Sequence, residues 1–353
     1  MNRPIKTGLI GFGMAGRVFH APFVYPQNGL ELYAISTSNA DAIALAASLY
    51  PTTKLVRTAD EIIGDPEVEL VIVATPNTSH LPLAKAAMES GKHVILEKPF
   101  TITSADADEL ITVARKTKRI LTVHHNRRFD GDYATVRKLL AANALGHLAE
   151  CRIHYDRYRP ALRPNAWREA DLPGSGILYD LGAHLIDQAL DLFGLPESVQ
   201  AEVLIQRPDG LVDDRFELVF SYPRLRVSLS AGMLVRQPGP HYTLLGDKGS
   251  FIKYGMDPQE NALKAGYSPL TQPDWGKDPE ENWGLLHTDW EGMEMKARIA
   301  TDTGRYQDFF ANVAAAIRDE APLVVLPEQA RNTIRMIELC LQSAAEKRTV
   351  PVS

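Results

Sequence analysis

Residues 7–16 read TGLIGFGMAG, and they set the architecture of the first half of the chain. A short apolar run leads into a GxGxxG pattern, which opens a stretch with helical periodicity. In such a turn the first glycine permits the tight bend, the second lets the backbone approach a pyrophosphate, and the third lets helix and strand pack closely. Free N–H groups at the helix start attract the anion. The sequence therefore predicts a dinucleotide-binding turn made of Gly11, Phe12, Gly13, Met14, Ala15 and Gly16.

Short apolar runs alternate with helical patterns from Ile5 to about His124. This alternation is typical of repeated βαβ units around a parallel sheet. The predicted strands are Gly8–Ile10, Leu30–Ile35, Leu55–Val56, Leu70–Ala74, His93–Leu96 and Ile120–Val123, and the predicted helices are Ala40–Leu49, Thr78–Glu89 and Ser104–Thr117. We expect an α/β protein in which residues 1–124 form the dinucleotide-binding domain.

The pattern changes after His124 to a helical stretch, followed by strand-like runs without helices between them. The runs 201–206, 215–221 and 225–235 predict an antiparallel sheet in a second domain, residues 125–353. The segment from Tyr254 to about Ala300 is rich in Pro, Gly, Trp and acidic residues, and we expect long loops with short strands there. Helical patterns at Tyr306–Ile317 and Pro327–Ala345 close the chain.

Composition narrows the class of protein. A chain of 353 residues is long enough for two packed domains. The net charge of -6, with Lys and Arg dispersed, argues against a nucleic-acid partner. Cys151 and Cys340 are the only cysteines, which argues against a disulfide framework or a structural zinc site and favours a reducing cytosol. We find no signal peptide and no run approaching the ~20 apolar residues of a membrane span, so we expect a cytoplasmic protein without membrane contact.

The tip of the second predicted strand reads Ser36-Thr37-Ser38-Asn39. An NAD enzyme normally places an acid there to bind the ribose hydroxyls. A carboxylate would repel the 2'-phosphate of NADP, whereas hydroxyl groups can donate hydrogen bonds to it. We therefore predict NADP as the preferred cofactor, bound by Ser36, Thr37 and Ser38. NAD is the alternative, with Asp41 reaching back or with no selectivity between the two.

Glu97-Lys98-Pro99 stands at the carboxyl end of the fifth predicted strand, and ligands of open α/β sheets bind outside those strand ends. The Lys98 ammonium can hydrogen-bond a substrate hydroxyl there and stabilise the alkoxide character that develops as hydride leaves. A single lysine is more often a solvated surface charge, and only the strand context favours the functional interpretation.

Asp180 and His184 lie four residues apart at the start of a helical pattern that continues to Phe193. That spacing places both side chains on one helix face. A neutral imidazole is the side chain best suited to accept a hydroxyl proton near pH 7, so His184 is the predicted general base. The alternative is an ordinary polar helix face, because Asp187 and Asp191 continue the same stripe. His124 and His125 point apart and have no evident third ligand, so we assign no metal.

Four motifs occur together: the early GxGxxG, Ala74-Thr75-Pro76-Asn77-Thr78-Ser79-His80, Glu97-Lys98-Pro99, and Asp180 with His184. In this order and spacing the chain resembles the Gfo/Idh/MocA oxidoreductases over almost its whole length. Residues 125–130 and 180–196 further resemble the subgroup with NADP-dependent scyllo-inositol dehydrogenases. The resemblance implies an N-terminal Rossmann domain and a C-terminal α/β domain with a large, mostly antiparallel open sheet that serves as an oligomer face. A homodimer or homotetramer is expected.

The resemblance also implies roles for individual residues. Lys98, Asp180 and His184 match the catalytic positions of the family. Cofactor contacts are expected from Thr75, Pro76, Asn77, His80, Glu97 and Lys98, and substrate contacts from Asn126, Arg127 and Asp156. These expectations describe an enzyme that moves a hydride between NADP and a secondary alcohol of a sugar or cyclic polyol. Two alternatives are a redox-assisted glycoside cleavage on the same scaffold and a sensor that binds NADP without turnover.

Overall fold

The computed structural model describes residues 3–24, 29–163 and 166–352, so the predicted domain limits at residues 1 and 353 lie outside it. Two compact units divide the chain. The first holds the residues up to Asn126 together with Gln259–Pro273 and Arg305–Asn332. The second holds Arg127–Pro258, Asp274–Gly304 and the chain from Thr333 onward. Two continuous domains, 1–124 and 125–353, therefore describe the chain incompletely, because two late segments pack into the first unit.

The first unit is built on a parallel sheet in the order β3-β2-β1-β4-β5-β6. Its strands are β1 (Ile5–Ile10), β2 (Leu30–Ser36), β3 (Lys54–Val56), β4 (Leu70–Val73), β5 (His93–Leu96) and β6 (Leu121–Val123). All four residues of β4 are buried, as expected of a strand covered on both faces. This is the predicted Rossmann domain.

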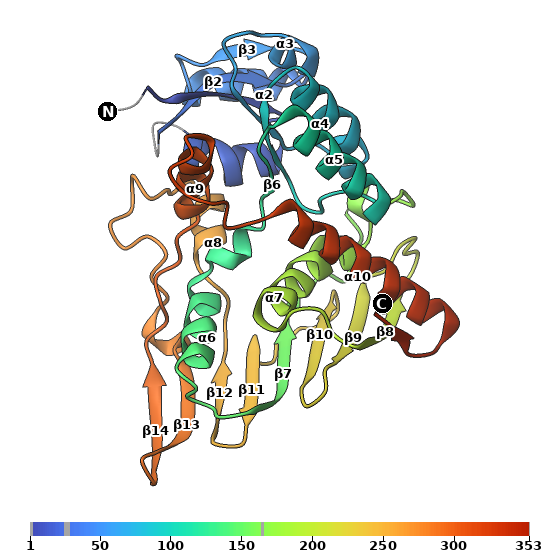
Figure 1. Ribbon diagram of the computed structural model, residues 1–353, viewed down its shortest axis with the longest axis vertical. Coiled ribbons are helices and arrows are strands. Elements are labelled where there is room, and N and C mark those ends of the chain that lie inside the picture. Colours follow the sequence, from blue (N-terminus) through green and yellow to red (C-terminus); the bar gives the residue numbers. More distant parts are fainter. Residues whose placement is uncertain (1–2, 25–28, 164–165, 353) are drawn as a thin grey trace. The chain divides into compact units, whose positions relative to one another are not determined.

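Helices connect these strands. They are η1 (Gly16–His20), α1 (Ala21–Val24), α2 (Ala40–Leu49), α3 (Ala59–Ile63), η2 (Asn77–Ser79), α4 (His80–Glu89) and α5 (Ser104–Thr117). Figure 1 shows α4 and α5 lying side by side, and Thr103 starts α5 with a capping box that includes Asp106. The late segments add α8 (Gln259–Lys264) and α9 (Gln307–Ile317). The Phe310 ring of α9 stacks on Phe23 at 5.4 Å, which explains why this segment belongs to the first unit.

The second unit is built on a nine-stranded sheet in the order β14-β13-β12-β11-β7-β10-β9-β8-β15. Only β7 and β10 pair in parallel, so the predicted antiparallel character is confirmed. The strands are β7 (Leu148–His154), β8 (Ser198–Leu204), β9 (Arg215–Ser221), β10 (Arg226–Gly232), β11 (Tyr242–Gly246), β12 (Gly249–Lys253), β13 (Gly284–Trp290), β14 (Met293–Ile299) and β15 (Val350–Pro351). Alternate residues of β8 and β9 are buried, as in a sheet covered on one face.

Helices α6 (Gly131–Ala141) and α7 (Ala183–Phe193) belong to this unit, with a π-helical turn η5 (Leu178–Gly182) leading directly into α7. Short turns η4 (Trp167–Glu169) and η6 (Glu280–Asn282) lie in its loops, while η3 (Asn126–Phe129) and α10 (Pro327–Glu346) cross the division between the units. Cys151 and Cys340 are buried and unbonded. None of the helices in the described ranges is both long and apolar enough to cross a membrane.

The segment 254–300 corrects one expectation. It contains β13 and β14, two seven-residue strands joined by a tight turn, and not only loops with short strands. β14 lies at the edge of the sheet and none of its residues is buried. Its sequence, MEMKARI, does alternate between apolar and polar residues, and the strand was missed because the Pro, Gly and acidic residues of the surrounding segment indicated loops.

Candidate functional site

The fingerprint turn lies where three parallel strands end. The backbone N–H of Gly11 donates to the carbonyl of Ser36 at 3.0 Å, and a Cβ added to Gly11 would lie 2.6 Å from the carbonyl oxygen of Ala74. A Cβ on Gly16 would lie 2.0 Å from the carbonyl oxygen of Gly11. A Cβ on Gly13, by contrast, would meet nothing within 4 Å. Gly11 and Gly16 are therefore required by packing, while Gly13 keeps a space open beside the turn, as a pyrophosphate requires.

The residues around this space fit a dinucleotide. Met14 is half exposed at the start of the helix, and Phe12 is buried beneath the turn. Ser36 is buried at the end of β2, and Asn39 uses its side chain to cap α2 by accepting from the N–H of Ala42 at 2.9 Å. The acid that an NAD enzyme would place here is absent, and Asp41 is an exposed residue in the first turn of α2.

Arg57 lies beside this strand end, and the sequence prediction missed it. It follows β3, which pairs with β2, and its Nη1 donates to the carbonyl of Ser38 at 3.5 Å. An arginine near the ribose accommodates the 2'-phosphate of NADP in Rossmann domains. The pairing of β3 with β2 brings Arg57 to Ser38, so only the strand order could have identified it.

His80 bridges the loop after β4 and the loop after β5. Its Nδ1 lies 3.0 Å from the carbonyl oxygen of Pro99, and its Nε2 lies 3.1 Å from that of Thr75. Burial lowers the pKa of this imidazole, which is only 1% exposed. The structure thus places His80 under the cofactor loop and not on its surface, whereas Thr75 is half-buried, Pro76 is exposed and Asn77 is buried in η2.

Glu97 forms a buried cluster with two histidines from elsewhere in the first unit. Its Oε1 accepts from Nε2 of His20 at 2.7 Å and from Nδ1 of His124 at 3.0 Å, and its Oε2 accepts from the backbone N–H of Lys98 at 3.1 Å. Burial opposes ionisation of Glu97, but the hydrogen bonds from His124 and His20 outweigh it and hold the pKa of the carboxyl well below its ordinary value. Burial, with the nearby His20, lowers the pKa of His124 to about 4. The cluster is a buried carboxylate that accepts hydrogen bonds from two imidazoles, directly behind Lys98.

The same three side chains have ligand atoms within 4.8 Å of one another, a spacing that also suits a metal ion. The sequence analysis found no third ligand for His124, and the fold supplies two candidates, His20 and Glu97. The N···O distances of 2.7 and 3.0 Å are hydrogen-bond lengths, so we interpret the group as a hydrogen-bonded support. Glu97 is buried within this cluster, and Lys98 is half-buried at the end of β5.

In the second unit, Asp180 lies in the π-helical turn before α7. Its Oδ1 accepts from Nε of Arg168 at 3.1 Å, and its Oδ2 lies 3.5 Å from Nη1 of Arg157. π-Helical turns are often found at functional sites, and this one holds Asp180 at the entrance of the helix that carries His184.

His184 is 6% exposed, and its ring centroid lies 6.4 Å from that of Tyr155. The guanidinium groups of Arg127 and Arg157 lie over the Tyr155 ring at 4.7 and 4.9 Å, and Arg127 also donates to the Tyr155 hydroxyl at 2.5 Å. Arg127 is thus a member of the group around His184. Asp180 contacts this group through Arg157, and His184 contacts it through Tyr155.

Asn126 and Asp156 are the other two residues predicted to contact substrate. Asp156 lies 3.8 Å from Nδ1 of His154, and Asn126 is buried in η3. Asp187 and Asp191 bind Arg128 at 2.7 and 3.0 Å. The part of the polar helix face that follows His184 therefore has a structural role. Lys98 belongs to the first unit, and Asp180 and His184 belong to the second.

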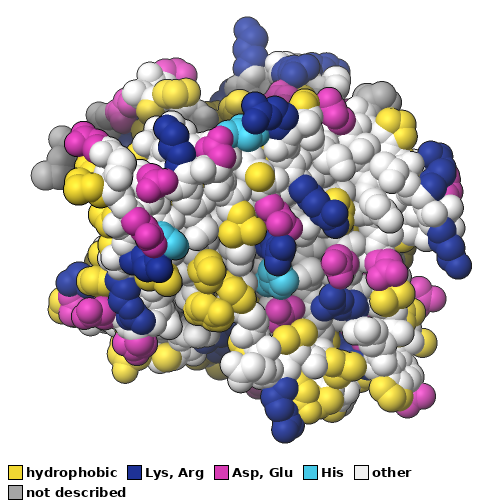
Figure 2. All heavy atoms as spheres, turned by 90° about the horizontal axis from the view of Figure 1, so that it is seen from below, with side chains coloured by type: hydrophobic (Ala, Val, Ile, Leu, Met, Phe, Trp, Pro, Cys, Tyr) yellow, Lys and Arg dark blue, Asp and Glu magenta, His cyan; other side chains and the backbone are white. Residues whose placement is uncertain are grey.

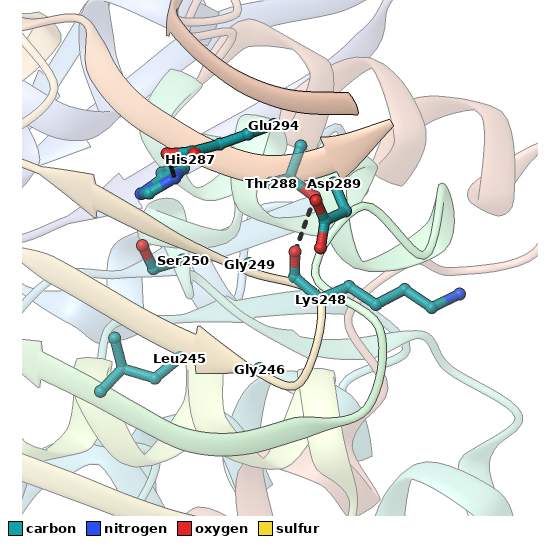
Figure 3. Close-up of a pocket in the computed structure, with 9 residues that line it drawn as sticks. All are labelled: Leu245, Gly246, Lys248, Gly249, Ser250, His287, Thr288, Asp289 and Glu294. Atoms are coloured by element: carbon teal, nitrogen blue, oxygen red, sulfur yellow. Dashed lines mark hydrogen bonds and ion pairs between the residues drawn. The ribbon is translucent and has the colours of Figure 1, made fainter. Parts of the chain in front are cut away.

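A separate hollow of about 470 Å³ lies over β11, β12 and β13. Figure 3 shows His287 turned toward Glu294, with their atoms 2.8 Å apart, while Lys248 extends away from the hollow. None of the predicted catalytic or cofactor residues in the described ranges lines it. We assign it no part in the site.

The fold and the fingerprint turn define a dinucleotide-binding oxidoreductase with a separate α/β domain. The chain belongs to the Gfo/Idh/MocA family: residues 5–125 match the family's NAD-binding Rossmann fold, and residues 137–352 match its C-terminal α/β domain. It is 41% identical to the oxidoreductase YdgJ of Escherichia coli, over 99% of both chains. It is 38% identical to the NADP-dependent scyllo-inositol 2-dehydrogenase IolW of Bacillus subtilis, over 98% of this chain and 95% of that one.

A solved structure of the oxidoreductase YvaA from Bacillus subtilis superimposes with a TM-score of 0.95, at 38% identity and with 99% of both chains covered. The protein is therefore an NAD(P)-dependent oxidoreductase of this family, as the motifs predicted.

Proposed function

We propose that this protein moves a hydride between NADP and a secondary alcohol of a sugar or cyclic polyol. The observation that carries the proposal is the β2 end: no carboxylate stands at Ser36, Thr37 or Ser38, and the Arg57 guanidinium lies at the Ser38 carbonyl. The relative IolW, whose name specifies NADP and scyllo-inositol, supports the same choice of cofactor and substrate class.

Bound NADP would supply the hydride acceptor, and the open space at Gly13 suits its pyrophosphate. The protein's own contribution is the handling of the hydroxyl. Lys98 donates a hydrogen bond to the substrate oxygen and stabilises its developing negative charge. His184 accepts the hydroxyl proton, and Asp180 orients the substrate. The reverse direction returns that proton from His184 to the oxygen.

The test is the change in absorbance of the reduced cofactor, measured with NADP and with NAD over a panel of inositols, aldoses and sugar acids. We expect turnover with NADP and at least one polyol or sugar, and a strong loss of kcat in a Lys98→Ala variant that keeps its affinity for NADP. A Lys98→Ala variant with the parental kcat would exclude the role given to Lys98. Tight NADP binding without turnover on any substrate would favour a sensor.

The uncovered face of the nine-stranded sheet suits self-association, and we propose a homodimer or homotetramer that uses it.

A further inference from the structure

Arginines gather on one side of Asp180 in the second unit. Arg157 and Arg168 each face one oxygen of the Asp180 carboxylate, at 3.5 and 3.1 Å. Arg159 lies two residues beyond Arg157 and interacts electrostatically with both Arg157 and Asp180. Two guanidinium groups thus contact one carboxylate, and the charge of a third acts on it, which leaves a local excess of positive charge.

Arg159 differs from the other arginines of this loop. Arg163 is paired with Glu169 at 3.1 Å, and Arg157 and Arg168 share Asp180. The Arg159 side chain makes no ion pair or hydrogen bond within residues 3–24, 29–163 and 166–352. It is half-buried, and the pKa of its guanidinium is lowered by burial and by the charges of Arg157 and Arg163.

The backbone that carries Arg159 is fixed in place. Its N–H donates to the carbonyl of Met233 at 2.7 Å, and its own carbonyl accepts from Nη1 of Arg207 at 3.3 Å. Arg207 is itself held by Asp214 at 2.9 Å. A half-buried guanidinium without an ion-pair partner, on a backbone segment held by hydrogen bonds, costs folding free energy. Like charges repel it, and burial removes its solvation. Such an arrangement is expected where a ligand supplies the missing negative charge.

The cluster is continuous with the candidate catalytic group. Arg157 covers the Tyr155 ring at 4.9 Å, and the same ring lies 6.4 Å from that of His184. Asp180 joins the two arginines to the turn that leads into the His184 helix. Arg159 therefore lies in the same part of the second unit as the residues around His184.

We propose that Arg159, supported by Arg157 and Arg168, binds an oxyanion on the substrate, so that the preferred substrate is an acidic sugar or polyol. This rests on the proposed function and narrows its substrate class. A guanidinium group binds a carboxylate and a phosphate ester by the same paired hydrogen bonds, so both substituents satisfy the site. A neutral hydroxyl would leave the positive charge uncompensated.

The first experiment compares three forms of one aldose: the neutral sugar, its uronate and its 6-phosphate. We expect kcat/KM to be about 10- to 100-fold higher for one charged form than for the neutral form, the range of one charge-assisted hydrogen bond. Arg159→Gln should lower kcat/KM for that charged form about 10- to 100-fold and so remove the preference. The choice between uronate and 6-phosphate identifies the oxyanion. A neutral sugar that is turned over as well as both charged forms overturns the proposal.

The control is Arg152→Gln, which removes the same charge from an exposed arginine that is paired with Glu150 on β7. A loss of selectivity in this control as well would show a long-range effect of net charge and would overturn the site. Arg159→Gln removes repulsion and no pairing, so the variant should fold with an unchanged or slightly higher Tm.

A second experiment separates this proposal from the proposed function. Binding of uronate, inorganic phosphate and neutral sugar is measured by calorimetry, in the presence of NADP and without turnover. Saturable binding of an anion that Arg159→Gln weakens about tenfold or more supports the site even if no sugar is oxidised, which would refute only the hydride transfer. Anion affinity that is equal in the wild type and the variant overturns the site even if neutral sugars are turned over.

Discussion

The Arg57 guanidinium is exposed and reaches the Ser38 carbonyl over 3.5 Å, which leaves most of its donors available to a ligand. We predict that Arg57→Ala lowers kcat/KM for NADP about 10- to 100-fold and leaves that for NAD within about twofold, because one charge-assisted contact to the 2'-phosphate is lost. Steady-state kinetics with both cofactors measure the effect.

Lys54→Ala provides the matched control, since Lys54 is a cation at the start of β3, three residues before Arg57, and its Nζ is paired with Asp65 at 2.8 Å. It should leave both rates unchanged. An equal loss with NAD and NADP in Arg57→Ala would mean that Arg57 supports the loop and does not select the cofactor.

Glu97 acts on Lys98 through the backbone. Its carboxylate accepts from two imidazoles and from the Lys98 N–H, and the amide of a Glu97→Gln variant could accept some of these bonds only by turning its NH₂ group toward another donor. We predict that Glu97→Gln lowers kcat about tenfold or more and costs about 1–3 kcal/mol of stability, while KM for NADP stays near the parental value. Steady-state kinetics and denaturant unfolding measure the two effects.

Stability alone would fall if Glu97 were merely structural, so His93→Gln serves for comparison. His93 also accepts a backbone N–H, from Ile120 at 3.0 Å, but it lies at the start of β5 and away from Lys98. His93→Gln should reduce stability without reducing kcat. Metal analysis of the purified wild type also bears on this cluster, since a stoichiometric bound ion would replace the hydrogen-bonded interpretation.

At the scale of elements, how far the sequence predicts the structure depends on the composition of the segment around each element. β4 is apolar and buried throughout and was predicted, whereas the edge strand β14 alternates between apolar and polar residues but was missed, because the segment around it is rich in Pro, Gly and acidic residues. The cofactor turn was predictable because its chemistry is local. The Glu97 cluster was not, because His20 lies 77 residues away in sequence and only the packing of α1 and α9 in the first unit gathers the aromatic rings around it.

The turn between β1 and its helix offers a matched pair of substitutions. A Cβ on Gly16 would meet the Gly11 carbonyl at 2.0 Å, whereas a Cβ on Gly13 would meet nothing within 4 Å. We predict that Gly16→Ala lowers Tm by several degrees or prevents folding, because the backbone at Gly11 would have to move away from the added methyl group. Gly13→Ala should keep the parental Tm but raise the Kd for NADP about tenfold or more, because the methyl group occupies the space needed by the pyrophosphate.

Thermal unfolding and calorimetric titration with NADP check the pair. If Gly13→Ala bound NADP as tightly as the wild type, the open space at this turn would not be the pyrophosphate site.

On the scale of the whole molecule, the charged surface is mixed and the buried charge is divided unevenly. Figure 2 shows Lys and Arg side chains interspersed with Asp and Glu on the face it presents, without a field of one sign. Inside, burial lowers the pKa of His124 and of His93 to about 4 in the first unit. In the second unit, burial raises the pKa of Asp213 to about 6, and burial with the neighbouring Asp257 raises that of Asp132 to about 7.

These shifts have opposite consequences for stability. A histidine with a lowered folded pKa takes up a proton on unfolding below about pH 6.5, so its unit loses stability as the pH falls from 6.5 toward 4. A carboxyl with a raised folded pKa is protonated in the folded state above pH 4, where the unfolded chain is ionised. Its unit therefore gains stability as the pH falls from 7 toward 4. In the second unit, His241, whose pKa burial lowers to about 3, offsets one of the two carboxyls.

We therefore predict that a shift from pH 7 to pH 5 destabilises the first unit, by about 1–2 kcal/mol for each of His93 and His124 and further through the buried His80, whose pKa is also lowered, and leaves the second unit unchanged or more stable. Hydrogen exchange followed by mass spectrometry resolves the two, by comparing the slowest amides of β4 and β5 with those of β7 and β10 after correction for the intrinsic pH dependence. His93→Gln should remove part of the response of the first unit and none of that of the second. Equal responses in both units would contradict the assigned protonation states, since only an uneven distribution of buried neutral histidines and protonated carboxyls separates them.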